Sequence, residues 1–293
     1  MSHSDQLARI TKAPGFIAAL DQSGGSTPKA LKLYGIEEDA YANDTEMFAL
    51  MQEMRARIIL APGFSSDKIL GAILFERTMH ETINGMPVAE FLWSQKGVVP
   101  FLKIDKGLEE TANGVQLMKP IAGLDETLKT AKSFGIYGTK ERSVVHDANA
   151  KGIADIVAQQ FELAEAVCGA GLVPILEPEV NIHSETKAEA EDMVRDEILR
   201  HLDKISSDVM LKLTIPSKPG LYDACADHQR VQRVVALSGG YSTAEACERL
   251  AKNSKMIASF SRALTEGLSA QQSDEAFDAA LGANIDKIFA ASS

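Results

Sequence analysis

One lysine of this sequence, Lys212, lies where covalent chemistry would be favoured. It sits inside the apolar run Val-Met-Leu-Lys-Leu-Thr-Ile and has no acidic neighbour in the sequence. Nearby lysines and partial burial would favour its uncharged amine. A free amine beside a carbonyl substrate forms an imine, so Lys212 is a candidate covalent nucleophile.

Other charged residues recur two positions apart within short apolar segments. This spacing places their side chains on one face of a strand. Buried charges are costly, so a set that converges on one interior must be mutually compensating or must bind a ligand. The candidates are Asp21, Lys103, Asp105, Lys140, Arg142, Glu177 and Glu179. Only Pro178 separates Glu177 from Glu179, so we expect these two carboxyls to crowd each other and to supply an acid and a base.

Glycine-containing segments with serines provide the second chemical signal. Glycine lets backbone N–H groups approach an anion closely, and serine adds a hydroxyl donor. Arginine can hold a phosphate through two parallel hydrogen bonds. Two such loops on opposite sides of one site predict a substrate with two phosphates. The residues concerned are Ser23, Ser26, Ser238, Gly239, Ser261 and Arg262.

The elements that must position these residues alternate along the chain. Short apolar runs predict strands at residues 16–21, 71–76, 98–105, 138–145, 172–180, 208–215, 234–238 and 256–261. Segments with helical spacing lie between most of them. Eight such units predict a (β/α)8 TIM barrel, in which the ends of the strands carry the active site. No linker interrupts the pattern, so we expect one domain over residues 1–293.

Several helices can be predicted with their ends. Residues 44–59 form an amphipathic segment, and residues 152–168 carry apolar residues at helical spacing before a Gly-Ala-Gly stop. Residues 186–189 and 242–245 both have the Ser/Thr-x-x-Glu pattern of a capping box.

Composition narrows the possible partners and compartment. The net charge is −11 over 293 residues, which argues against a nucleic-acid partner. No apolar run is long enough to span a membrane, and no signal peptide is visible. The three cysteines, Cys168, Cys225 and Cys247, form no disulfide or zinc pattern and indicate a reducing cytoplasm. The sequence is compatible with a homo-oligomer but does not specify one.

Taken together, these segments resemble the class I fructose-bisphosphate aldolases, in the shorter form found in bacteria. Residues 18–26 resemble the family's first-strand motif, which usually reads Ala-Ala-Asp-Glu-Ser-Thr-Gly-Ser. Matching pieces follow in the family's order at residues 71–79, 103–107, 140–142, 177–179, 237–240 and 260–264. The Glu-Pro-Glu and Lys-x-Asp-Lys-Gly pieces are specific in combination.

The resemblance implies reversible cleavage of fructose 1,6-bisphosphate to dihydroxyacetone phosphate and glyceraldehyde 3-phosphate, without metal or cofactor. Lys212 would form the imine, Glu177 would act as acid and base in the carbinolamine steps, and Glu179 would support it. Lys140 would stabilise charge near the reacting carbons, and Asp21 would handle the hydroxyl proton during carbon–carbon cleavage.

The resemblance also implies two phosphate sites at the ends of the substrate. One would use Arg262, Ser238 and Gly239, and the other would use Ser23, Ser26 and Lys103. Arg142 and Ser261 are expected to complete the substrate-binding set.

The sequence departs from the family pattern in three places. Around Lys212 the family often reads Leu-Leu-Lys-Pro-Asn, whereas this chain reads Met-Leu-Lys-Leu-Thr-Ile-Pro. Gln22 stands where an acidic residue is common. The better-known animal members end in a tyrosine that assists proton transfer at the dihydroxyacetone-phosphate carbon, whereas the last tyrosine here is Tyr241. We therefore expect proton exchange at that carbon to be slow relative to cleavage.

Other functions remain open on the sequence alone. A metal-dependent aldolase would need a histidine cluster, and the six histidines here are scattered without ligand spacing. A transaldolase-like or deoxy-sugar aldolase would share the chemistry of Lys212. A non-catalytic barrel that binds a phosphosugar is the third alternative, because one fold hosts many functions.

Overall fold

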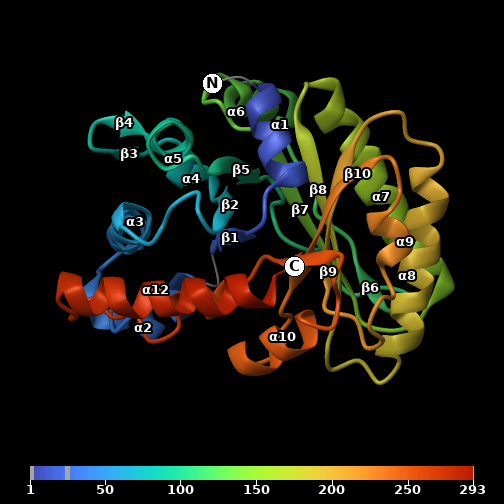
Figure 1. The fold of residues 1–293 in the computed structure, drawn as a ribbon. Coiled ribbons are helices and arrows are strands. Elements are labelled where there is room, and N and C mark those ends of the chain that lie inside the picture. Colours follow the sequence, from blue (N-terminus) through green and yellow to red (C-terminus); the bar gives the residue numbers. More distant parts are fainter. Residues whose placement is uncertain (1–2, 24–26, 293) are drawn as a thin grey trace.

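Eight parallel strands in the computed structural model, which describes residues 3–23 and 27–292, form a nearly closed barrel (Figure 1). Each strand pairs with the next along the chain, and in the described residues no pairing joins the two end strands. The predicted (β/α)8 architecture is confirmed. The strands are β1 (Phe16–Leu20), β2 (Ile69–Leu74), β5 (Val99–Lys103), β7 (Gly138–Val145), β8 (Val173–Val180), β9 (Val209–Thr214), β10 (Val231–Leu237) and β11 (Met256–Ala258).

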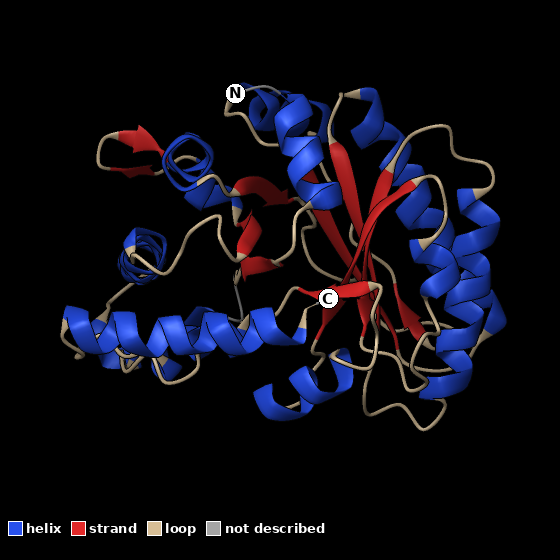
Figure 2. Cartoon of the chain, viewed as in Figure 1, coloured by secondary structure: helices blue, strands red, loops and turns tan. Residues whose placement is uncertain are grey.

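Helices connect the strands and cover the outside of the barrel (Figure 2). They are α1 (His3–Lys12), α2 (Thr27–Leu33), α3 (Asp44–Leu60), α4 (Glu76–Met79), α5 (Val88–Lys96), α6 (Leu124–Ser133), α7 (Ala150–Gly169), α8 (Lys187–Leu202), α9 (Asp223–Ala226), α10 (Thr243–Leu250), α11 (Arg262–Thr265) and α12 (Asp274–Ala291). Smaller elements are the 3-10 helix η2 (Glu38–Ala40), the hairpin β3 (Thr82–Ile83) with β4 (Met86–Pro87), and β6 (Val115–Gln116), which pairs antiparallel with β7.

The ends of the helices follow local sequence signals in two of three cases. Gly171 adopts a left-handed conformation with φ 81° just after α7, as the Gly-Ala-Gly stop predicted. The Ser242 hydroxyl accepts the Glu245 N–H at 3.3 Å and caps α10, as predicted. The prediction of a capping box at Thr186 is wrong, because the Thr186 hydroxyl does not cap α8 and instead accepts the Ala148 N–H at 2.8 Å.

The half of the barrel interior nearer the N-terminal ends of the strands is apolar, and Phe101 lies within it. A Cβ on Gly71 would lie 2.9 Å from the Phe101 ring, and one on Gly138 would lie 3.0 Å from it. Glycine on both neighbouring strands therefore makes room for a large ring in the lumen. Arg233 donates to the carbonyls of Ile10 and Ala13. These hydrogen bonds hold α1 across the N-terminal end of the barrel.

Six of the eight barrel strands end earlier than predicted, and the ends of two of them bear on the site. The segment predicted as 256–261 is a strand only to Ala258, since the chain then turns into α11. The segment predicted as 98–105 ends at Lys103. Just after this end, the Asp105 carboxylate accepts the backbone N–H of Arg142, on the neighbouring strand β7, at 3.2 Å. A side chain thus accepts the hydrogen bond that a backbone carbonyl accepts in a regular strand pair. Both strand ends lie at the same mouth of the barrel as the charged residues.

Candidate active site

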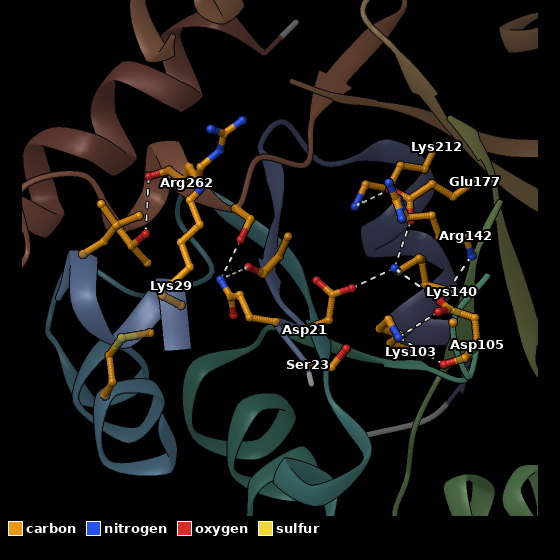
Figure 3. Close-up of a pocket in the computed structure, with 18 of the residues that line it drawn as sticks. Asp21, Ser23, Lys29, Lys103, Asp105, Lys140, Arg142, Glu177, Lys212 and Arg262 are labelled. Carbon is orange, nitrogen blue, oxygen red and sulfur yellow. Dashed lines mark hydrogen bonds and ion pairs between the residues drawn. The ribbon is translucent and has the colours of Figure 1, made fainter. Parts of the chain in front are cut away.

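A pocket of about 630 Å³ opens at the C-terminal ends of the strands (Figure 3). Its size is in the range typical of small-molecule sites. Ten of the residues predicted from the sequence line it, Asp105 among them. The ten are Asp21, Ser23, Lys103, Asp105, Lys140, Arg142, Glu177, Lys212, Ser261 and Arg262.

Lys212 lies on β9 with its side chain turned into the barrel. The strand alternation places Leu211 and Leu213 in the outer core against the helices, whereas Met210 faces the barrel interior. Lys212 is only 4% exposed. Its Nζ lies 3.1 Å from Oε1 of Glu177. Lys212 therefore has an acidic partner that its own sequence neighbourhood does not contain.

Glu177 connects the two central lysines. Its second carboxylate oxygen, Oε2, lies 2.9 Å from the Nζ of Lys140. Burial by itself would raise the pKa of Glu177, but the positive charges of Lys140 and Lys212 outweigh it and hold the pKa below its ordinary value. The carboxylate is thus ionised and placed to receive a proton from Lys212.

Lys140, on β7, is the centre of the charge cluster. Besides Glu177, its Nζ lies 2.8 Å from Asp21 and 3.7 Å from Asp105. Burial would lower the pKa of Lys140, but these three carboxylates raise it above its ordinary value. Asp21 responds in the opposite sense: burial would raise its pKa, and the ammonium groups of Lys140 and Lys212 hold it well below the ordinary value. Lys140 is therefore a permanent cation held by three carboxylates.

Glu179 does not crowd Glu177. It forms an ion pair with Arg142, which lies two residues after Lys140 on β7. The expectation of a mutually repelling carboxyl pair is wrong, because each glutamate has its own cation on a neighbouring strand. Glu179 is not among the residues that line the pocket, whereas its partner Arg142 is.

The opposite side of the pocket carries cations without acidic partners. Figure 3 shows Arg262 and Lys29 on one side, the lysine–carboxylate cluster on the other, and Asp21 between them. In the described residues, neither Arg262 nor Lys29 has a carboxylate within 4.0 Å, whereas Lys103 pairs with Asp105 at 2.8 Å. Lys29, on α2, was missed by the sequence reasoning. The sequence signal that could have identified Lys29 is its position shortly after the predicted anion-binding segment that contains Ser23 and Ser26.

A hydrogen bond closes the pocket over the unpaired edge of the barrel. Gln22 Nε2 donates to Ser261 Oγ at 2.6 Å, linking the loop after β1 to the loop after β11. Nε2 also donates to the carbonyl of Ala19 at 3.5 Å, a contact that the ionised acidic residue common at this position in the resembling family has no donor to make.

The glycine turn after β10 lies beside Arg262 rather than in the pocket wall. Ser238 accepts the Tyr241 N–H at 3.0 Å to close the turn, and Gly239 has φ 61°. A Cβ on Gly240 would lie 3.7 Å from the Arg262 guanidinium. Neither Ser238 nor Gly239 lines the pocket as described. The predicted Ser26 lies outside the described residues.

Two further features bear on ligands and location. Among residues 3–23 and 27–292, no group of three or more His, Cys, Asp or Glu is arranged to hold a metal ion. None of the helices in these ranges has the length and apolar character that crossing a membrane requires.

Comparison with known proteins gives consistent matches. Residues 4–224 match the family model described as fructose-bisphosphate aldolase class-I. A fructose-bisphosphate aldolase class 1 of Synechocystis is 56% identical over 292 residues, covering 99% of this chain and 97% of that protein. The protein of the same description from Porphyromonas gingivalis is 54% identical over 290 residues and covers 99% of each chain.

Solved structures match in fold. The fructose-bisphosphate aldolase of Plasmodium falciparum superimposes with a TM-score of 0.79 at 20% identity, covering 99% of this chain and 93% of that one. An archaeal fructose-1,6-bisphosphate aldolase, whose catalytic lysine is covalently bound to the carbinolamine intermediate of its substrate, has a TM-score of 0.53 at 12% identity, covering 98% of this chain and 100% of that one.

Proposed function

The chain belongs to the class I fructose-bisphosphate aldolase family, and from this premise we propose that it cleaves fructose 1,6-bisphosphate reversibly through an imine on Lys212. The products are dihydroxyacetone phosphate and glyceraldehyde 3-phosphate. The observation that supports this assignment most directly is the 3.1 Å contact between Lys212 Nζ and Glu177 Oε1 in the pocket.

Imine formation begins with a proton transfer from Lys212 to Glu177. The free amine then attacks the ketone carbon, and the carbinolamine forms. Lys212 is uncharged at this stage, so Glu177 has lost one of the two cations that lowered its pKa. The protonated Glu177 gives its proton to the carbinolamine hydroxyl, which leaves as water. Lys140 remains a cation throughout and keeps Glu177 oriented.

Carbon–carbon cleavage uses the iminium as an electron sink. Asp21 removes the proton of the hydroxyl on the carbon that becomes the aldehyde, and the bonding electrons flow to the imine nitrogen as an enamine. Asp21 is available as a base because Lys140, 2.8 Å away, keeps it ionised. Protonation of the enamine carbon and hydrolysis of the imine then release dihydroxyacetone phosphate.

The two phosphates would bind at the two cationic ends of the pocket. Arg262 and Lys29 provide one end, with Ser238 and Gly239 supplying donors from the adjacent turn. The other end uses Lys103, Arg142, Ser23 and Ser26. The first end should bind phosphate more tightly, because Lys103 and Arg142 already have carboxylate partners.

Borohydride trapping tests the proposed mechanism. The protein is incubated with dihydroxyacetone phosphate in EDTA, reduced, and mapped by mass spectrometry. A reduced triose-phosphate adduct on Lys212 is expected in the wild type. Lys212→Met should give no adduct, and the matched control Lys187→Met should still give the adduct on Lys212. An intact, folded protein that gives no adduct on Lys212 contradicts the proposal.

We also propose that the enzyme works in the cytoplasm. Cys168, Cys225 and Cys247 are all free thiols in the structure, which suits a reducing compartment. Labelling of all three cysteines by a thiol reagent after denaturation of protein taken directly from cells would support this, and their blockage as disulfides would contradict it.

A further inference from the structure

A second, smaller cavity lies outside the active site, between α3 and α4. Its volume is about 160 Å³, compared with about 630 Å³ for the active-site pocket, and the two share no lining residue. The residues that line it are Thr45, Phe48, Ala49, Gln52, Arg55, Arg77, Thr78 and Glu81.

Arg55 forms the inner wall of this cavity and is 2% exposed. One guanidinium nitrogen donates to Thr78 Oγ1 at 2.9 Å, and another donates to the carbonyl of Gln22. The third, Nε, is buried without a partner among the described residues. Burial lowers the pKa of Arg55 to about 10, so it is still a cation at neutral pH. No carboxylate in the described part of the chain lies within 4.0 Å of it, so its charge is buried without an ion-pair partner.

A second cation stands at the rim. Arg77 is exposed and lies over the Phe48 ring at 4.4 Å from the ring centre. Glu81 is the acidic residue of the lining, yet within the described ranges it forms no ion pair with either arginine. The cavity walls therefore carry a net positive charge.

Gln52 adds uncommitted polar atoms to the same cavity. Its amide nitrogen and oxygen are both buried and have no hydrogen-bond partner within residues 3–23 and 27–292. Buried polar groups are nearly always hydrogen-bonded, because leaving one unpaired costs on the order of 1–3 kcal/mol. Both Gln52 and Arg55 line the cavity, so it is bordered by a buried cation and by an amide whose hydrogen-bonding capacity the described residues leave unused.

We propose that this cavity binds a small oxyanion of the size and charge of inorganic phosphate. Arg55 and Arg77 supply the countercharge, and Gln52 and Thr78 supply neutral contacts. The cavity is too small for the six-carbon substrate and stands apart from the substrate pocket, so the site goes beyond the aldolase reaction. It is linked to that reaction through Arg55, which also holds the carbonyl of Gln22 beside Asp21.

Phosphate titration by isothermal calorimetry tests the proposal. Because the proposed function also places phosphate in the active site, most tightly at the Arg262 end, the titrations are run in an Arg262→Ala background. Arg77→Gln removes the exposed cation without disturbing the core. Arg200→Gln, on the distant helix α8, removes the same charge from another exposed position and serves as the matched control.

In the Arg262→Ala background we expect phosphate to bind. Adding Arg77→Gln should weaken this binding about tenfold or more, because one charge-assisted contact is lost. Adding Arg200→Gln should leave it unchanged. Equal affinity in the Arg77→Gln and Arg200→Gln proteins would overturn the proposal, as would the absence of phosphate binding in the background protein. Borohydride trapping on Lys212 should be the same in the Arg77→Gln single variant and wild type, which separates this test from that of the aldolase mechanism.

Discussion

At the scale of single residues, Lys140 determines the charge state of the site. Its ammonium lies 2.8 Å from Asp21 and 2.9 Å from Glu177; Lys140 and Glu177 are buried, and Asp21 is largely so. Removing one member of a buried ion cluster leaves the others without compensation, which is far more costly than breaking an exposed pair. Asp21 and Glu177 would then lose the partner that lowers their pKa.

Lys140→Met is therefore expected to reduce kcat by about 100- to 1000-fold, because both the acid–base pair and the developing charge lose support. Steady-state cleavage of fructose 1,6-bisphosphate measures this loss. Lys103→Met makes the same change on the neighbouring strand, where the amine pairs with Asp105, and should act mainly on KM. Similar kcat values for the two variants would argue against a central role for Lys140.

Glu141, next to Lys140, faces the opposite side of β7 and is fully buried. Its side chain accepts a hydrogen bond from Thr139, and its Oε2 has no partner among the described residues. Burial raises the pKa of Glu141 to about 8. The folded protein thus keeps a proton that the unfolded chain releases above a pH of about 4.5. Between these two values the contribution of Glu141 to stability must fall as pH rises.

The stability difference between Glu141→Gln and wild type should therefore change with pH. We expect it to shift in favour of the variant by up to about 1.4 kcal/mol for each pH unit between the two values, because glutamine has no proton to lose. Urea unfolding at pH 5, 6.5 and 8 measures the trend. Asp21 and Glu177 act in the opposite direction in both proteins, since their stabilising charge is lost as pH falls through their lowered pKa values. A constant difference across this range would show that Glu141 is ionised in the folded state.

At the scale of elements, α12 holds the segment that carries Arg262. The amide of Asn284, on α12, donates to the carbonyl of Leu264 at 3.1 Å and to that of Glu266 at 2.7 Å. These carbonyls belong to α11 and the residue after it, and Arg262 begins α11. A phosphate-binding arginine on a helix of a single turn needs such support, because a helix that short has little stability of its own.

Asn284→Ala should raise KM for fructose 1,6-bisphosphate several-fold while kcat changes little. It should also lower the free energy of unfolding by about 1–3 kcal/mol, since two carbonyls lose their donor. Ser273→Ala removes the cap of the same helix and costs about 1 kcal/mol without touching α11. If Ser273→Ala raises KM equally, the effect comes from the stability of α12 and not from the position of Arg262.

At the scale of the whole molecule, neighbouring strands of the barrel pack tightly where they carry glycine. A Cβ on Gly138 would lie 2.0 Å from the carbonyl oxygen of Val173, on the neighbouring strand β8. It would also press on Phe101, which fills the lumen below the charged cluster. Close-packed interiors do not absorb such a group without moving the backbone.

Gly138→Ala is expected to destabilise the protein by about 3 kcal/mol. Gly282→Ala is the matched control, because Gly282 lies within α12 and a Cβ there would meet nothing within 4 Å. That substitution should stabilise the protein by about 0.4–1 kcal/mol, since alanine is the better helix former. Chemical denaturation of both variants should give opposite signs, and a neutral Gly138→Ala would mean that β7 and β8 can separate without cost.

The amino-acid sequence by itself determined the barrel and the faces of its strands. Alternation along a strand is a local property, so the positions of Lys140, Glu177 and Lys212 within their apolar runs were enough to predict that all three face one interior. The caps at Ser242 and Gly171 were predictable for the same reason. Each depends on a few consecutive residues.

Only the tertiary structure decided which charges meet. Glu177 is closer to Glu179 in sequence than to either lysine, yet it pairs with Lys140 and Lys212, while Glu179 pairs with Arg142. Likewise, Thr186 bonds to a distant backbone amide instead of capping its own helix. These partners are set by the lateral register of strands and the placement of loops, which depend on packing between residues far apart in the chain. A pattern within one segment does not contain that information.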